Sequence, residues 1–522
     1  MKPVKLALAV TALLGACYGQ AQALDLYVDT KTKQLFAEPG RGRVKLGTFE
    51  QVSEPDKGAK ETKRSVQEIE RSLDQQKAEL TAMETRLDKK KDTMKAVEKK
   101  IDTAAAMAPA STEKKWYDKL SIRGYGQLRY SQLLGNHTQI DRTQLMTPTD
   151  RSVGQNQDLL LRRARLVVSG DITDYMYIYL QGDMSANIAG NTAPSTSDST
   201  SQGNFFQMRD YYADIFFDKA HEYRIRAGQS KVPFMWENLQ SSQNRVSFER
   251  ADAINSTAVR DERDLGIWAM WTPDNIQQRF KYLQKSGLKG SGDYGVVALG
   301  TFNGQGANRF EFNDAMHLGA RVTYPFELPL DQILEVGASG FFGRYNPSTT
   351  AYVNQGRTIA APIQVGNTPL NTGRGYDDSR YGFHAILYPK PFGLQTEWTW
   401  GRVPTLDLGN NTLASKGTNG GYVMAMYKLD HFYGTWVPYA KWEMNRGGSK
   451  FDYNSPYMFT EQVEVGVEWQ PRPEFEITAA YAYMDRTNLS AGSLSGIPGL
   501  KTTSSYQRAV GDVLRLQLQY NY

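Results

Sequence analysis

The sequence predicts an all-β transmembrane barrel of about 16 antiparallel strands, preceded by an α-helical coiled coil. Three observations predict the barrel: apolar and polar residues alternate over long stretches, a secretory leader opens the chain, and the last residue is aromatic. Alternating strands keep the mean hydropathy low, here −0.54 with 22% charged residues. After the leader, no apolar run reaches the roughly 18 residues of a membrane-spanning helix.

The C-terminus shows the alternation most clearly, because successive side chains of a strand point to opposite faces. The apolar face consists of Leu514, Leu516, Leu518, Tyr520 and Tyr522. The polar face consists of Arg515, Gln517, Gln519 and Asn521. One face is suited to lipid and the other to a water-filled lumen.

The same period recurs in residues 120–130, 436–444 and 463–469, and again after a turn at Pro471–Pro473. We expect a short turn at residues 170–174 and long external loops at 185–204, 345–380 and 404–421. Alternation alone does not exclude a soluble β-sandwich, whose apolar face would point inward. Charged residues on the polar faces, together with the leader and the aromatic terminus, favour the barrel.

Residues 1–23 have the pattern of a secretory signal peptide. Lys2 and Lys5 precede the apolar residues 6–16, and Ala21-Gln22-Ala23 forms a cleavage site. An alternative remains open, because residues 14–17 (LGAC) resemble a lipobox in which Cys17 would be lipidated. The leader predicts export to the bacterial outer membrane.

Three segments are expected between the leader and the barrel: a small polar β segment (24–59), a coiled coil (60–103) and a linker (104–115). The coiled coil rests on heptad spacing. Its a positions are Val66, Leu73, Leu80, Leu87, Met94 and Ile101, and its d positions are Ile69, Gln76, Met83, Lys90 and Val97. We expect a self-associating periplasmic stalk; an amphipathic helix lying on its own barrel is the alternative.

Residues 116–522 resemble the phosphate-selective porin O/P family of outer membranes. The most similar segments are residues 209–214 (RDYYAD), 228–234 (GQSKVPF), 237–242 (ENLQSS), 248–250 (FER), 263–266 (RDLG) and 302–306 (FNGQG). Residues 463–483 resemble the penultimate hairpin. The resemblance implies a trimer of 16-stranded barrels, each with its third external loop folded inward within about residues 234–260.

Passive diffusion of small ions or polar solutes needs a lumen whose charges select what enters, rather than a reactive group. Arginine binds phosphate oxygens in a bidentate manner, so basic residues are candidate anion contacts. The candidate pore-lining residues are Arg123, Arg129, Arg163, Arg165, Arg224, Arg226, Lys231, Arg245 and Arg250. Each could instead pair with a nearby carboxylate.

The charge balance limits what these residues imply. Residues 1–115 carry 22 basic and 17 acidic residues of the chain's 61 and 56, which leaves 39 of each in residues 116–522. The predicted barrel is therefore neutral overall. Any preference for anions or phosphate must come from local placement.

Two other function classes are alternatives to a porin. An enzyme in a barrel would need a nucleophile or an acid–base cluster, and the five His residues lie in no recognisable hydrolase motif. A non-conducting structural or binding protein with a coiled-coil stalk is the main alternative. We expect no catalytic, metal or cofactor site and no nucleic-acid partner; the expected partners are lipid, the solutes and other copies of the chain.

Overall fold

The computed structural model describes most of the barrel and parts of the N-terminal region. The described residues are 23–29, 35–36, 38, 43–50, 81, 85, 115–137, 153, 158–185, 206–259, 263–349, 352–354, 357–359, 375–431, 433–491 and 504–522. Nearly all of the expected signal peptide, coiled coil and linker lies outside these residues, as does most of the expected loops at 185–204 and 345–380.

The chain divides into two compact units, residues 1–111 and 112–522. The first contains a three-stranded antiparallel sheet in the order β2-β1-β3. Its strands are β1 (Ala23–Asp29), β2 (Leu35–Phe36) and β3 (Arg43–Glu50).

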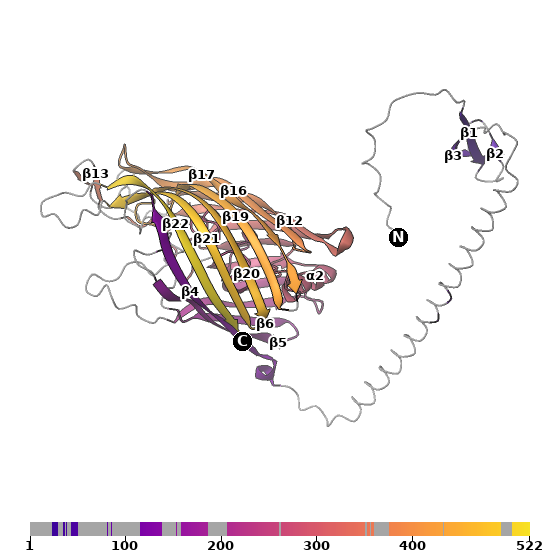
Figure 1. The fold of residues 1–522 in the computed structure, drawn as a ribbon, viewed down its shortest axis with the longest axis horizontal. Helices are drawn as coiled ribbons and strands as arrows, with labels where there is room; N and C mark the ends of the chain where they lie inside the picture. Colours follow the sequence, from indigo (N-terminus) through magenta and orange to yellow (C-terminus); the bar gives the residue numbers. More distant parts are fainter. Residues whose placement is uncertain are drawn as a thin grey trace. The chain divides into compact units, whose positions relative to one another are not determined.

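The second unit is a closed β-barrel, in which each strand pairs antiparallel with its neighbours in the chain (Figure 1). Its ring contains β4 (Ser121–Asn136), β5 (Asp158–Thr173), β6 (Met176–Asp183), β7 (Gln207–Phe216), β8 (Tyr223–Lys231), β9 (Arg263–Trp271), β10 (Val297–Phe302), β11 (His317–Glu327), β12 (Ile333–Tyr345), β15 (Tyr376–Leu387), β16 (Phe392–Asp407), β17 (Thr412–Tyr427), β18 (Leu429–His431), β19 (Gly434–Gly448), β20 (Tyr457–Arg472), β21 (Phe475–Ala491) and β22 (Ser504–Asn521).

Sixteen of these strands complete the circuit among the described residues, because β17 pairs directly with β19 and the three-residue β18 only extends that hairpin. Outside the ring, β13 (Tyr352–Asn354) and β14 (Arg357–Ile359) form a small hairpin. The barrel closes where β22 pairs with β4, the yellow and purple strands that lie side by side in Figure 1. Closure leaves no strand edge unpaired, as a bilayer requires. The predicted barrel of 16 antiparallel strands is confirmed.

The predicted face assignment is also confirmed. On β22, Leu516 is 47% exposed on the outer surface, whereas Arg515 is 1% exposed in the interior. On β20, Val465 is 52% exposed and Glu464 is 1% exposed. Outward residues are exposed here because lipid would cover them, and the polar face is turned into the barrel.

One expected loop is wrong. Residues 404–421 were expected to form a long external loop, but β16 and β17 continue through most of this stretch and are joined by residues 408–411. Their pairing extends from Phe392↔Tyr427 to Asp407↔Thr412. Residues 403–406, near the end of β16, are all buried instead of alternately buried and exposed, so this part of the strand lacks the alternation that marks a lipid-facing strand in the sequence.

The two ends of the barrel differ. The end that contains Tyr522 has mostly short turns, such as residues 473–474 between β20 and β21. One connection at this short-turn end is much longer: residues 272–296 join β9 to β10 and contain α2 (Asp274–Lys285). Among the described residues, no helix is both long and apolar enough to cross a membrane.

We predict that Leu516→Arg destabilises the barrel by about 2–4 kcal/mol, the cost of a basic residue near the bilayer midplane. The apolar replacement Leu516→Met serves as the control. The measurement is reversible denaturant unfolding in phospholipid vesicles. A cost below about 1 kcal/mol would show that this face does not contact lipid.

Candidate functional site: the lumen constriction

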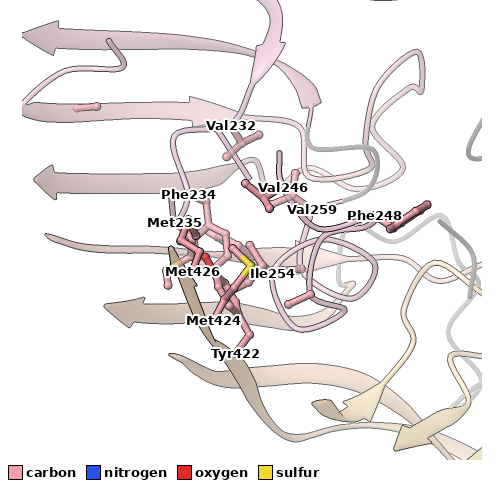
Figure 2. Close-up of a cluster of buried hydrophobic side chains, with 14 of the residues drawn as sticks. Val232, Phe234, Met235, Val246, Phe248, Ile254, Val259, Tyr422, Met424 and Met426 are labelled. Atoms are coloured by element: carbon pink, nitrogen blue, oxygen red, sulfur yellow. The ribbon is translucent and has the colours of Figure 1, made fainter. Parts of the chain in front are cut away.

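The loop between β8 and β9 folds into the barrel. We call its described part, residues 232–259, the inner loop. Its apolar side chains pack against apolar residues on the interior face of β17, and Figure 2 shows Met235 and Ile254 facing Tyr422, Met424 and Met426. All five side chains are almost completely buried. This contact fixes one side of the inner loop to the barrel wall.

Hydrogen bonds and ion pairs hold the same side of the loop. The backbone N–H groups of Trp236 and Glu237 both donate to the carboxylate of Glu397 on β16, at 2.6 Å each. The Glu237 carboxylate pairs with Lys441 on β19 at 2.8 Å. Asp252 pairs with Arg486 on β21 at 2.6 Å. Strands remote from β8 in the ring therefore position the loop.

The opposite side of the inner loop presents a single carboxylate to four guanidinium groups. Glu249 lies 2.7 Å from Arg129 on β4, and 2.9 and 3.1 Å from Arg162 and Arg163 on β5. Arg245, within the loop, lies 3.6 Å away. We call these five residues the arginine cluster. The formal charges of these five described residues sum to about +3.

A β-bulge brings Arg162 into the arginine cluster. Strict alternation would place Arg162 and Arg163 on opposite faces, but the pairing register shifts between Gln127 and Leu128 opposite them. Both arginines are therefore interior, 5% and 3% exposed. A bulge inserts one extra residue in a strand and changes which side chains point inward. The sequence analysis missed Arg162 for this reason.

The electrostatics of the arginine cluster keep Glu249 charged. Burial alone would raise the pKa of its carboxyl, but the nearby guanidiniums, those of Arg162 and Arg163 foremost, hold this pKa well below its ordinary value. Arg163 Nε and Arg245 Nη1 are buried without a hydrogen-bond partner among the described residues. These two N–H donors of the cluster are therefore not satisfied by the part of the protein that the structure describes.

The interior charges are divided between two walls. We call β4–β9 the basic wall; its buried basic residues are Arg129, Arg162, Arg163, Arg165, Arg209, Arg224, Arg226, Lys231 and Arg263. They outnumber its buried carboxylates, which are Asp183, Asp210, Asp214 and Asp264. The buried carboxylates on β12–β21 are Glu335, Asp378, Glu397, Glu443, Glu464, Glu468 and Asp485, and they outnumber the buried basic residues of the same strands, Arg380, Lys441 and Arg486. The described interior charges are therefore unevenly distributed around the lumen.

Arginine and tyrosine side chains form a row along the basic wall. Arg123 lies 5.6 Å from the ring centre of Tyr179, and the rings of Tyr179 and Tyr212 stack at 5.2 Å. Arg226 lies 4.0 Å from the ring centre of Tyr212 and 5.1 Å from that of Tyr294. Cation–π contacts fix the orientation of both guanidiniums, and the charge of Arg226 is balanced by Asp214.

The other predicted pore-lining residues have structural partners. Arg165 pairs with Asp183 at 2.9 Å, and Arg226 pairs with Asp214 at 2.7 Å. Three more hold segments in place: Arg224 pairs with Asp293, Lys231 donates to the carbonyls of Leu239 and Gln240, and Arg250 donates to those of Glu237 and Gln240. Of the nine, Arg129, Arg163 and Arg245 converge at one point, and Arg123 alone is exposed.

Within the part of the chain that the structure describes, no group of three or more His, Cys, Asp or Glu side chains could hold a metal ion. The polar groups at the constriction are chiefly guanidinium, ammonium and carboxylate groups engaged with one another. Their arrangement can attract and orient ions in transit.

Comparison with known families identifies the phosphate-selective porin O and P family, which matches residues 132–522. No curated protein sequence matches the chain significantly.

Solved outer-membrane channels share only low similarity with the chain. The trimer form of OmpT from Vibrio cholerae is 10% identical, with 77% of this chain and 99% of that chain covered and a TM-score of 0.44. OmpF of Salmonella typhi in complex with daunomycin is 10% identical, with coverages of 78% and 98% and a TM-score of 0.45. An anion-selective porin from Comamonas acidovorans is 11% identical, with coverages of 77% and 99% and a TM-score of 0.40. These values are too low to assign a solute or a subunit number to this chain.

We predict that Glu249→Gln makes the constriction more selective for anions, because it raises the local charge from about +3 to about +4. The matched control is Asp331→Asn, which removes a carboxylate from an exposed turn and suits the positive φ of 57° at that position. The measurement is the reversal potential of reconstituted channels in a salt gradient. Equal potentials for Glu249→Gln and the wild type would contradict the placement of Glu249 at the constriction.

Proposed function

Because the chain belongs to the phosphate-selective porin O and P family, we propose that its channel prefers small anions and conducts them along the basic wall. The chain is an outer-membrane porin, and its barrel is a channel for passive diffusion. The family consists of channel proteins rather than enzymes. The proposal concerns which solutes pass and which residues select them.

The observation that carries the proposal is the arginine cluster. Four guanidiniums meet where the inner loop approaches β4 and β5, and each lies within 3.6 Å of the Glu249 carboxylate. At an effective dielectric constant of about 20, one net positive charge attracts a monovalent anion about 5 Å away by about 3 kcal/mol. That energy corresponds to roughly a hundredfold preference before desolvation is subtracted. The cluster is therefore strong enough to set the sign of the selectivity.

The solute class follows from the chemistry of the donors. Guanidinium groups present paired N–H donors that match the oxygens of phosphate or carboxylate. In this proposal the nine predicted basic residues and Arg162 line the path. Arg129, Arg162, Arg163 and Arg245 bind the anion at the constriction, while Arg123 and Arg226 guide it along the row of tyrosines.

Processing and assembly are further parts of the proposal. The signal peptide (1–23) is removed, the β segment (24–59), coiled coil (60–103) and linker (104–115) lie in the periplasm, and three copies associate as the resemblance implies. A mature N-terminus at Leu24, read by mass spectrometry, would support removal of the signal peptide; a lipidated Cys17 would support the lipobox instead.

The competing function is a non-conducting structural or binding protein with a coiled-coil stalk.

We predict the sign of the reversal potential of the wild-type channel in a planar bilayer with a tenfold KCl gradient. The sign should show that Cl⁻ is more permeant than K⁺. Phosphate added to one side should reduce the single-channel current, because it competes for the arginine cluster. A reversal potential showing that K⁺ is more permeant than Cl⁻ would contradict the proposed anion preference. Purified trimers that conduct nothing would favour the structural alternative.

We predict that Arg162→Gln with Arg163→Gln lowers anion selectivity and abolishes block by phosphate, because only two guanidiniums then face Glu249. The control is Arg402→Gln, which removes an exposed guanidinium from β16 at a distance from the cluster. Both variants are measured by reversal potential and by phosphate titration of the current. If the control and the double variant behave alike, the cluster does not select the solute.

A further inference from the structure

A second segment lies in the lumen, at the short-turn end. We call residues 272–296 the crossing segment. Near β8 and β9 it is fixed by Asp293, whose carboxylate pairs with Arg224 at 2.9 Å and accepts from the Thr272 hydroxyl at 2.8 Å. Burial alone would raise the pKa of Asp293, but Arg224 holds it below its ordinary value. One end of the crossing segment is thus anchored to the wall from which it emerges.

The crossing segment also reaches the opposite wall. Lys289 Nζ lies 2.5 Å from Glu468 on β20 and 3.2 Å from Glu476 on β21. Around the ring of sixteen strands, β20 is eight strands from β9 in either direction. Two strands separated by half the ring face each other across the lumen. A chain fixed at Asp293 and at Lys289 must therefore cross the barrel near its diameter.

Helix α2 buries the apolar side of the crossing segment inside the barrel. Ile276, Phe280 and Leu283 recur at helical spacing and are at most 3% exposed. They pack in one cluster with Trp236 of the inner loop and with the wall residues Ile333, Ile386 and Tyr388. A hydrogen bond from Gln240 Nε2 to the Lys289 carbonyl, at 2.8 Å, joins the inner loop to the crossing segment directly.

We propose that the crossing segment is a second, size-limiting constriction of the channel, and that Lys289 is the positioning residue that fixes it across the lumen through Glu468 and Glu476. The inner loop selects by charge; the crossing segment sets the largest solute that leaves the channel. In outer-membrane barrels the short-turn end faces the periplasm, so this constriction lies at the periplasmic mouth.

The chemistry of the Lys289 contact makes it a strong fixation point. Burial alone would lower the pKa of Lys289, but Glu468 and Glu476 raise it above its ordinary value, so the ammonium group stays charged. Replacing Lys289 alone would leave two interior carboxylates without their cation, which is itself destabilising. The three charges must be removed together to release the segment without creating an unpaired buried charge.

The test uses the full-length protein in liposomes and planar bilayers. Lys289→Met/Glu468→Gln/Glu476→Gln neutralises the contact, and Lys289→Gln/Glu468→Gln/Glu476→Gln, which removes the same three charges with a polar side chain at position 289, is the second variant if the first does not fold. Lys281→Met is the matched control, because Lys281 is exposed on α2. Single-channel conductance and liposome swelling in neutral sugars of increasing size are measured. Released variants should show about a twofold rise in conductance and admit larger sugars than the wild type and the control.

The outcomes separate this inference from the proposed anion preference. Neutral sugars report size alone, whereas the reversal potential reports charge selectivity. An unchanged conductance and sugar limit in a folded released variant would overturn the second constriction, even if the channel prefers anions. A raised sugar limit would support it, even if the reversal potential showed no anion preference.

Discussion

The constraint on which this structure depends is closure of the backbone hydrogen-bond network in a medium without water. Pairing of β22 with β4 completes a ring in which each strand has two neighbours. Once the ring is closed, alternate side chains must face either lipid or lumen, so Leu516 and Arg515 separate to opposite sides. Charged side chains, which a bilayer excludes, are concentrated in the interior of the barrel, where they can contact solutes.

Sixteen strands enclose more space than the wall side chains alone fill, and two segments narrow it. The inner loop lies against the apolar interior face of β17 and extends Glu249 toward β4 and β5. The crossing segment packs against Trp236 of the inner loop, and its Lys289 pairs with Glu468 on β20. Because the two segments contact each other, the charge selection and the size selection that we propose would occur at neighbouring depths, and a change in one segment can displace the other.

The interior ion pairs show how basic and acidic side chains can be separated inside a barrel region that has 39 of each. Carboxylates on β16, β20 and β21 are used to hold the inner loop and the crossing segment, through Glu397, Glu468 and Glu476. In the arginine cluster, four guanidiniums surround the single carboxylate of Glu249. A neutral total charge therefore coexists with an excess of basic side chains among these five residues.

The sequence by itself determined the features that follow from local period: the barrel class, the face assignment of strands such as β22, and the family, because these depend on residues close together in the chain. It predicted that Arg129, Arg163 and Arg245 face the lumen, but it did not predict that they converge on Glu249. It missed Arg162 because a β-bulge interrupts the alternation of inward and outward side chains. The spacing of Ile276, Phe280 and Leu283 is typical of one apolar face of a helix and indicates α2. Only the tertiary structure decided that Lys289 meets Glu468, because pairing across the lumen depends on strand order and register around a closed ring.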